Sequence, residues 1–328
     1  MEVLRVDSLS EILRALRLTS GFFLEAEFTA PWCIDSAPRR EAVRGILPRA
    51  EHLAIYHLLT HGECRVSLAD ERASIDLSAG DLILFPRCDA HVLGSDLELQ
   101  PVFAEALVQA TRSGGLLRIQ HGGGGATTRF MCGFLACDSP VSQPLLTALP
   151  RMLRVRVGDT SAGPWLLDTL RRGADETRQA RPGAEAVLAK LSELVFVEAI
   201  RAYIEALPAD QKGWYAALRD SFVSRALALI HAEPAKSWTV DKLGREVGLS
   251  RSALAERFTL FLDMPPMQYL TRARMALAAR ELRDSTETVL RIAEHVGYDS
   301  EAAFNRAFKR TFGMPPASWR RQSGSRAA

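Results

Sequence analysis

LGREVGLSRSALAERFTLFLDMPPMQYL (243–270) and IAEHVGYDSEAAFNRAFKRTFGMPPASW (292–319) decide the fold of the last third of this chain. The second stretch repeats the first. Gly248 matches Gly297 at a separation of 49 residues, and Phe258 matches Phe308 at a separation of 50, so the repeat contains one inserted residue. An internal repeat of this quality indicates two copies of one structural unit.

Each copy predicts two helices joined by a tight turn. Glycine ends the first helix because it tolerates positive φ, and a serine or aspartate caps the second: Ser250 in the first copy, Asp299 or Ser300 in the second. Apolar residues spaced three and four apart predict the buried faces. They are Leu243, Val247, Leu254, Phe258 and Phe261, then Ile292, Ala293, Val296, Phe304, Phe308 and Phe312. The alanine-rich stretch 269–283 predicts a connecting helix, which would hold the two units about one DNA turn apart, ~34 Å.

Tandem units of this kind, with VGYDSEAAFNRAFKRTFGMPPASWR (296–320) in the second, resemble the DNA-binding domain of the AraC/XylS family of transcriptional regulators. The resemblance implies that the second helix of each unit enters the major groove of promoter DNA. It implies base contacts from the outward residues Ser252, Ala255, Glu256, Ser300, Glu301, Ala302, Asn305 and Arg306. Phosphate contacts are expected from Arg251, Lys309 and Arg310.

The chemistry of these side chains suits base reading unevenly. Arg306 can bind guanine through two hydrogen bonds, Asn305 can bind adenine, and a glutamate can accept from cytosine. The two alanines offer at most a methyl contact with thymine. For any one of these residues, the alternative is an ordinary solvated helix face.

The charge distribution agrees with a nucleic-acid-binding C-terminus. Residues 221–328 hold 17 Lys+Arg and 11 Asp+Glu, a net charge of +6, and the rest of the chain carries −4. A basic module joined to a slightly acidic body argues against an architectural protein that coats DNA along its whole length.

The first part of the chain has a different pattern. Short apolar runs alternate with turn residues over 22–137, which predicts a sandwich or a small barrel, with a helical exception at 101–112. A short helix is expected at 9–16 and a hairpin tip at the glycine run 122–125. The stretch 184–207 predicts a long helix that packs on the barrel, forms a dimer seam, or does both.

Two segments resemble cupin barrels. They are YHLLTHGECRVSL (56–68) and LSAGDLILFPRCDAHVL (77–93). With Pro31-Trp32 and the helix over 181–204, they are similar to the cupin-type sensor domain of many AraC-like regulators. The expected fold is therefore α+β in two domains: a cupin-like barrel with flanking helices that senses an effector and dimerises (1–207), a linker (208–219), and an all-α domain with two helix-turn-helix motifs (220–328).

The resemblance points to His57, His91 and Trp32 as candidate ligand-binding residues inside the barrel. Metal-binding cupins use an HxH pair, a Glu and a later His, and only His91 stands at a matching position. We therefore expect neither a metal nor a cofactor. The alternative for both histidines is that they are hydrogen-bonded strand residues.

We expect no signal peptide at the charged N-terminal stretch, and an odd count of five cysteines then argues against a disulfide framework. Cys88, Cys132 and Cys137 are candidates for sensing oxidants or electrophiles, because thiolates are reactive. The alternative is buried, inert cysteine.

The resulting expectation is a sequence-specific transcriptional regulator, controlled by a small-molecule or chemical signal, and not an enzyme. Its expected partners are double-stranded promoter DNA, an effector of unknown identity, RNA polymerase and a second copy of the chain. No segment has the ~18 apolar residues of a membrane span, so a cytoplasmic location is expected. The alternatives are a cysteine-based redox regulator and a cupin enzyme fused to a DNA-binding domain.

Overall fold

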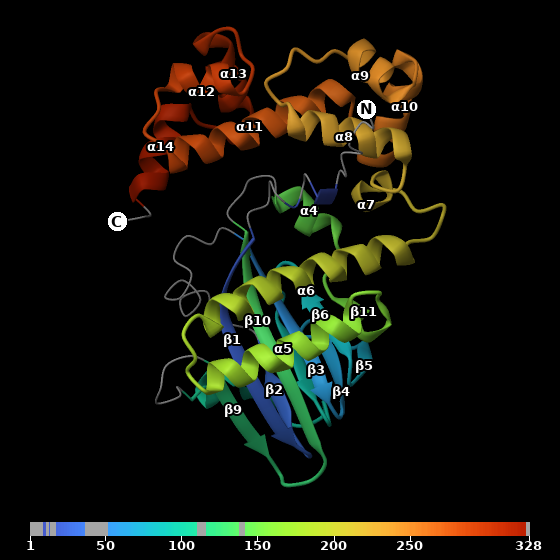
Figure 1. Cartoon of the computed structure of the whole chain (residues 1–328), viewed down its shortest axis with the longest axis vertical. Helices are drawn as coiled ribbons and strands as arrows, with labels where there is room; N and C mark the ends of the chain where they lie inside the picture. The colour runs from blue at the N-terminus through green and yellow to red at the C-terminus, as the bar shows by residue number, and fades with distance from the viewer. Residues whose placement is uncertain are drawn as a thin grey trace. The chain divides into compact units, whose positions relative to one another are not determined.

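A computed structural model describes residues 9, 10, 13, 18–36, 52–109, 116–137 and 142–325. The described chain forms two compact units (Figure 1). The β unit contains the described residues of 18–137 and 149–205, and the helical unit contains those of 142–148 and 206–325. The short helix expected at 9–16 lies mostly outside the described residues.

The β unit consists of two sheets. One has six strands in the order β11-β6-β3-β10-β1-β9, and the other has five in the order β5-β4-β7-β2-β8. Only β1 with β9 and β2 with β8 pair in parallel among the described strands. The strands are β1 (Leu18–Thr29), β2 (Cys33–Asp35), β3 (His52–His61), β4 (Glu63–Leu68), β5 (Ser74–Ser78), β6 (Asp81–Phe85), β7 (His91–Gly94), β8 (Val102–Phe103), β9 (Leu117–Gly122), β10 (Thr127–Cys137) and β11 (Leu153–Arg156).

The core of the β unit lies between the two sheets. Alternate residues of each strand point inward, as the two-residue period of a strand requires. The inward residues of the six-stranded sheet include Phe28, Ile55, Ile83 and Phe130; they share one buried cluster with Val66 and others from the second sheet. The expected cupin-like sheets are confirmed, and they form two facing layers.

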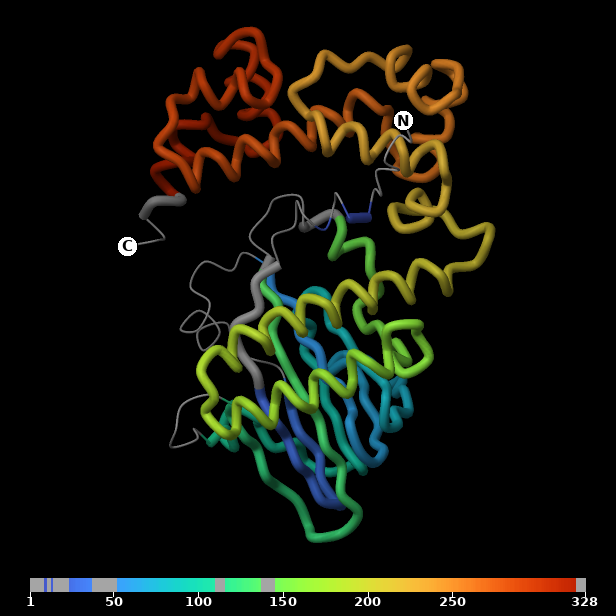
Figure 2. The backbone as a smooth tube through the Cα atoms, viewed as in Figure 1, coloured from blue at the N-terminus to red at the C-terminus, as the bar shows by residue number. Residues whose placement is uncertain are grey.

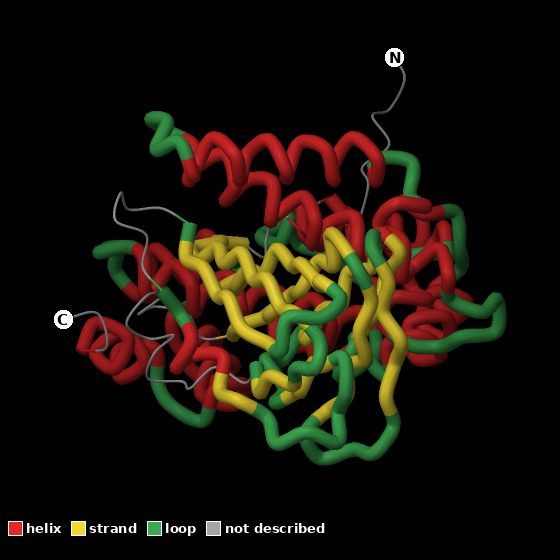
Figure 3. Tube along the Cα trace, turned by 90° about the horizontal axis from the view of Figure 1, so that it is seen from below, coloured by secondary structure: helices red, strands yellow, loops and turns green. Residues whose placement is uncertain are grey.

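Two helices cover the outer face of the six-stranded sheet (Figure 3). They are α5 (Gly163–Arg178) and α6 (Ala184–Ala206), which run side by side as an antiparallel pair (Figure 2). The α6 helix is anchored where the Tyr56 hydroxyl of β3 meets the Ser192 hydroxyl. The short elements α3 (Ala104–Leu107) and η1 (Val157–Asp159) complete the unit.

Two local predictions were wrong. The glycine run 122–125 is not a hairpin tip, because β9 and β10 do not pair: they flank β1 on opposite sides. The run crosses the end of β1 so closely that a Cβ at Gly122 would lie 1.9 Å from the Thr29 carbonyl oxygen. The helix expected at 101–112 is reduced to the four residues of α3, and 110–112 lie outside the described part.

The helical unit contains the predicted repeat. Its elements are α4 (Ser142–Ala148), α7 (Trp214–Ala217), α8 (Ser221–Ala232), α9 (Val240–Val247), α10 (Arg251–Leu262), α11 (Pro266–Asp284), α12 (Val289–His295), α13 (Glu301–Phe312) and α14 (Pro316–Ser325). Helices α8 to α10 surround one buried core and α12 to α14 surround another. Helix α11 contributes to both cores, Leu270 to the first and Met275 to the second.

The predicted buried faces are present in both copies. All the predicted core positions are buried except Phe261 and Phe312, which are half-buried. Part of the segment expected to be a linker forms α7, and its Ala217 is buried in the first core. None of the described helices is both long enough and apolar enough to span a membrane.

Candidate functional site

The two helix-turn-helix motifs have matching turns. Gly248 follows α9 with φ +84°, and Gly297 follows α12 with φ +82°. These are left-handed conformations that side chains with a Cβ rarely adopt, so the sequence requires glycine there. The helix after each turn begins at a serine cap: Ser250 Oγ accepts from the Ala253 amide at 3.2 Å, and Ser300 Oγ from the Ala303 amide at 3.3 Å. The motifs thus present α10 and α13 in the same local geometry.

The predicted base-contacting residues lie on the free faces of α10 and α13 or at their first caps. Ala255 and Asn305 are half-buried, and the other six are exposed. Ser300 is also the cap of α13, so its hydroxyl already accepts a backbone hydrogen bond. The predicted phosphate-contacting residues Arg251, Lys309 and Arg310 are exposed as well. Together these residues form two helix faces with mixed donor and acceptor chemistry.

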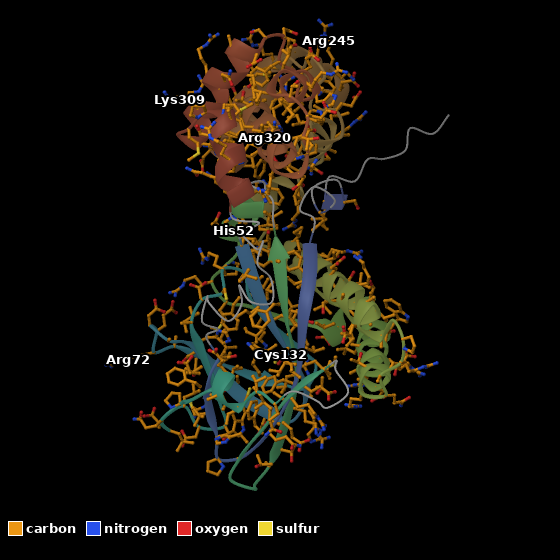
Figure 4. All side chains as sticks on the ribbon, turned by 90° about the vertical axis from the view of Figure 1, so that its left-hand side faces the viewer. His52, Arg72, Cys132, Arg245, Lys309 and Arg320 are labelled. Atoms are coloured by element: carbon orange, nitrogen blue, oxygen red, sulfur yellow. The ribbon has the colours of Figure 1, made fainter. Side chains whose placement is uncertain are left out.

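The exposed basic side chains of α10 and α13 differ in whether they are paired. Arg306 and Lys309 make no hydrogen bond or ion pair within the described residues, whereas Arg251 lies 3.9 Å from the exposed carboxylate of Asp241. Lys309 and Arg245 project outward from the helical unit (Figure 4). Arg245 was not among the predicted contacts, although its position on α9 of a helix-turn-helix motif would have suggested it.

A chain of buried polar side chains crosses the core of the β unit. His57 on β3 is 4% exposed and His91 on β7 is fully buried. His57 Nε2 lies 2.8 Å from His91 Nε2, and His57 Nδ1 lies 2.9 Å from Cys132 Sγ on β10. Figure 4 labels Cys132 among the side chains of the β unit. The sequence suggested each of these three residues separately but did not predict that they touch.

The proton positions in this hydrogen-bonded series follow from the acceptor at its end, the Asp89 carbonyl oxygen. His91 Nδ1 lies 2.8 Å from the Asp89 carbonyl oxygen, which can only accept, so that nitrogen carries the proton. Because a neutral imidazole carries only one proton, His91 Nε2 must then accept a hydrogen bond from His57 Nε2. His57 Nδ1 is left as an acceptor, and the Cys132 thiol donates to it. All three groups are therefore satisfied as neutral species.

Burial keeps these groups uncharged. Desolvation lowers the pKa of His57 well below its ordinary value, and the nearby His91 lowers it further. Desolvation also lowers the pKa of His91 to about 4, against the opposing effects of the Asp89 carbonyl and of the Asp35 and Asp89 carboxylates. Burial raises the pKa of the Cys132 thiol.

The other candidates of the β unit lie in different surroundings. Trp32 is buried and stacks on Phe28 at 4.4 Å between ring centroids, and its Nε1 has no hydrogen-bond partner within the described residues. Phe130 lies between Trp32 and His57, 6.1 and 6.4 Å from their ring centroids. Cys88 is half-buried, and the side chain of Cys137 lies outside the described part.

A polar groove that the sequence did not predict lies between α5 and the outer face of the six-stranded sheet. Its volume is about 510 Å³, within the range of small-molecule sites. Four arginines and three carboxylates line it: Arg118, Arg129, Arg171, Arg178, Glu25, Glu27 and Asp175. Each carboxylate pairs with an arginine, but Arg171 has no partner within the described residues. Only tertiary packing brings these strands and α5 together.

The described residues contain no group of three His, Cys, Asp or Glu side chains arranged to hold a metal ion. His57, His91 and Cys132 touch, but they do not converge on one point, because Cys132 and His91 approach opposite nitrogens of the His57 imidazole.

Two family models match the chain. The model described as Cupin matches residues 7–205, and the model described as Helix-turn-helix domain matches residues 243–322. The first match covers more than half of the chain and includes the whole β unit.

Known proteins match over almost the whole length. An AraC-like transcription regulator from Streptomyces lividans is 33% identical over 96% of this chain and 98% of its own length. The HTH-type transcriptional regulator AlkR from Acinetobacter baylyi is 31% identical over 97% of this chain and all of its own. The crystal structure of the DNA-binding domain of AdpA in complex with a target DNA matches 33% of this chain and 96% of that chain, with 26% identity and a TM-score of 0.32.

Proposed function

The chain belongs to the AraC-like transcription regulators and carries a cupin domain, and from this premise we propose that it reads promoter DNA with α10 and α13 under the control of a signal sensed in residues 1–207. We assign DNA reading to residues 220–328 and the connection to 208–219. The observation that carries the proposal is the repeat of two motifs with matching turns, caps and exposed second helices.

The sequence-specific part of the proposal rests on the free face of α13. Arg306 has no partner in the described chain, and guanidinium binds guanine through two hydrogen bonds. Lys309, one turn away and also unpaired, serves as a phosphate contact, which positions the protein without reading sequence. The two residues therefore provide a matched test on one helix.

In that test, Arg306→Ala weakens binding to the specific site by about 1–3 kcal/mol and changes non-specific binding less. Lys309→Ala weakens binding to all DNA similarly and lowers the salt slope by about one. Footprinting upstream of the chain's own gene supplies the specific site, and titrations at two salt concentrations supply the affinities. An equal loss on all DNA for Arg306→Ala would make that residue a phosphate contact and refute its reading role.

We place the sensed signal in the β unit, where the groove beneath α5 supports a sensing role. The groove beneath α5 has the volume of a small-molecule site and one unpaired guanidinium, which favours an anionic effector. The core residues Trp32, His57 and His91 are packed against aromatic rings, so a ligand there must displace them.

A second candidate function is the sensing of oxidants by Cys132, favoured by its contact with His57. With hydrogen peroxide, the sulfur attacks one oxygen, the O–O bond breaks, and the leaving hydroxide takes up the thiol proton as water. The product is a sulfenic acid. His57 Nδ1 lies 2.9 Å from the sulfur and is therefore placed to accept the thiol proton during the attack.

Cys64 is a matched control for this second function, because it is buried in the same core and has no imidazole partner within the described residues. We expect peroxide to change the DNA affinity of the wild type and of Cys64→Ser, with Cys132 trapped as a dimedone adduct, and to leave Cys132→Ser unchanged. A response that survives in Cys132→Ser would eliminate this candidate.

We further propose that the regulator is a homodimer that acts on RNA polymerase in the cytoplasm, where promoter DNA is found. Trp165 on α5 is 58% exposed and Val187 on α6 is 46% exposed, so both helices of the pair offer apolar surface to a second copy. Sedimentation of Trp165→Glu and Val187→Glu tests this surface. A dimer that persists in both variants would place the interface elsewhere.

A further inference from the structure

One arginine on α11 binds the main chain of the loop before the first helix-turn-helix motif and of the turn within the second. Arg274 Nε donates to the Pro234 carbonyl at 2.7 Å, and Nη2 donates to the Lys236 carbonyl at 2.9 Å. These carbonyls lie in the loop that leads from α8 to α9, directly before the first motif. Arg274 Nη1 donates to the Gly297 carbonyl at 3.0 Å, in the turn of the second motif.

The two loops also touch each other beside this guanidinium. A Cβ at Gly297 would lie 2.5 Å from the Ala235 carbonyl oxygen, so only glycine permits this approach. The Tyr298 ring lies against the guanidinium, with its centroid 5.8 Å from Cζ. A shift of one motif past the other would break these contacts together.

The joint between the motifs depends on few residues. Each motif has a separate core, and α11 crosses from one to the other (Figure 1). A long helix can bend, so it does not by itself fix the orientation of two domains packed on its ends. Arginine suits the additional task because its planar fork of five N–H donors can hold several carbonyls in one geometry, which a lysine ammonium does not do.

We propose that Arg274 is the positioning residue that fixes the distance and rotation between α10 and α13, and thereby sets the spacing of the two half-sites that the chain accepts. This inference rests on the proposed reading of DNA by both motifs. One base pair changes the rotation between half-sites by about a tenth of a turn. A rigid joint therefore predicts a narrow spacing preference, and a loosened joint predicts a broad one.

The experiment uses the full chain and DNA selected by the wild type from a random duplex library. Affinities are measured for the selected site, for each half-site alone, and for sites with one or two base pairs inserted or removed between the halves. We expect the affinity of the wild type to fall about tenfold or more when the spacing changes by one base pair. The second motif then no longer reaches its half-site at a high effective concentration. Arg274→Ala should bind all spacings within about threefold of one another, and each half-site within about threefold of the wild type.

Two variants on the same helix sharpen the result. Arg272→Ala removes an exposed arginine that has no partner within the described residues, and it should keep the wild-type spacing preference. Arg274→Lys should give an intermediate preference, because charge is kept and the fork is lost. Hydrogen exchange provides a test without DNA: in Arg274→Ala, amides of 233–239 and 296–299 should exchange faster together, while those of α10 and α13 stay protected.

A wild-type spacing preference in Arg274→Ala would overturn the inference. Loss of binding to single half-sites, with loss of protection in α10 or α13, would also overturn it and give Arg274 a role in folding. Absence of any gain from a second half-site in the wild type would instead refute the proposed reading of DNA by both motifs.

Discussion

Acidification should lower the free energy of unfolding of the β unit, because two neutral imidazoles lie in its core. Burial lowers the pKa of both His57 and His91. The unfolded chain therefore binds protons that the folded chain excludes. The stabilisation is complete above the unfolded pKa, near 6.5, and it is lost as the pH falls toward 4.

The size of the effect follows from the shift of His91. With a pKa that falls from 6.5 to about 4, lowering the pH from about 7.5 to about 5 removes about 2 kcal/mol from the free energy of unfolding. His57 acts in the same direction. The Asp35 and Asp89 carboxylates and the Cys132 thiol face the pair, and the two carboxylates limit the shift of His91.

Urea unfolding at the two pH values measures this loss, with hydrogen exchange of peptides from β3 and β10 reporting on the β unit alone. That readout is needed because burial also lowers the pKa of His231, in the helical unit, to about 4. The double variant His57→Gln and His91→Gln removes both titrating groups. Between the two pH values, the double variant should lose less than about 1 kcal/mol of unfolding free energy. His231→Gln should show the full wild-type loss in the β3 and β10 peptides.

The reasoning fails if the double variant loses as much stability on acidification as the wild type. The pH dependence would then come from other titratable groups of the β unit rather than from the buried pair.

Three further substitutions test the packing and the caps. Phe308→Ala removes a fully buried ring from the second core and should cost about 3–5 kcal/mol in urea unfolding of the helical unit; a loss below about 1 kcal/mol would contradict the described core. Ser250→Ala and Ser300→Ala should each cost about 1 kcal/mol of unfolding free energy, because they remove the caps of α10 and α13. Equal hydrogen-exchange protection at the helix starts in variant and wild type would show that the caps contribute nothing. Tyr56→Phe removes the buried hydroxyl contact between β3 and α6 and should cost about 1 kcal/mol, with faster exchange in α6.

The sequence by itself determined the helical unit almost completely. Helix-turn-helix motifs are built from contacts close in sequence, so glycine turns, serine caps and apolar spacing specify them locally. Gly248, Ser250, Gly297 and Ser300 occupy the conformations that the residue types predict. The basic charge of 221–328 and the exposed face of α13 could be predicted for the same reason.

Only the tertiary structure decided what lies between the elements. The pairing of β1 with both β9 and β10 overturned the predicted hairpin, because strand neighbours depend on contacts far apart in sequence. The same long-range packing joins Cys132, 75 residues from His57, to that imidazole, and places Arg171 over the sheet. Arg274 binds carbonyls 40 residues before it and 23 residues after it. Because every residue has a backbone carbonyl, no sequence pattern predicts which carbonyls an arginine will bind.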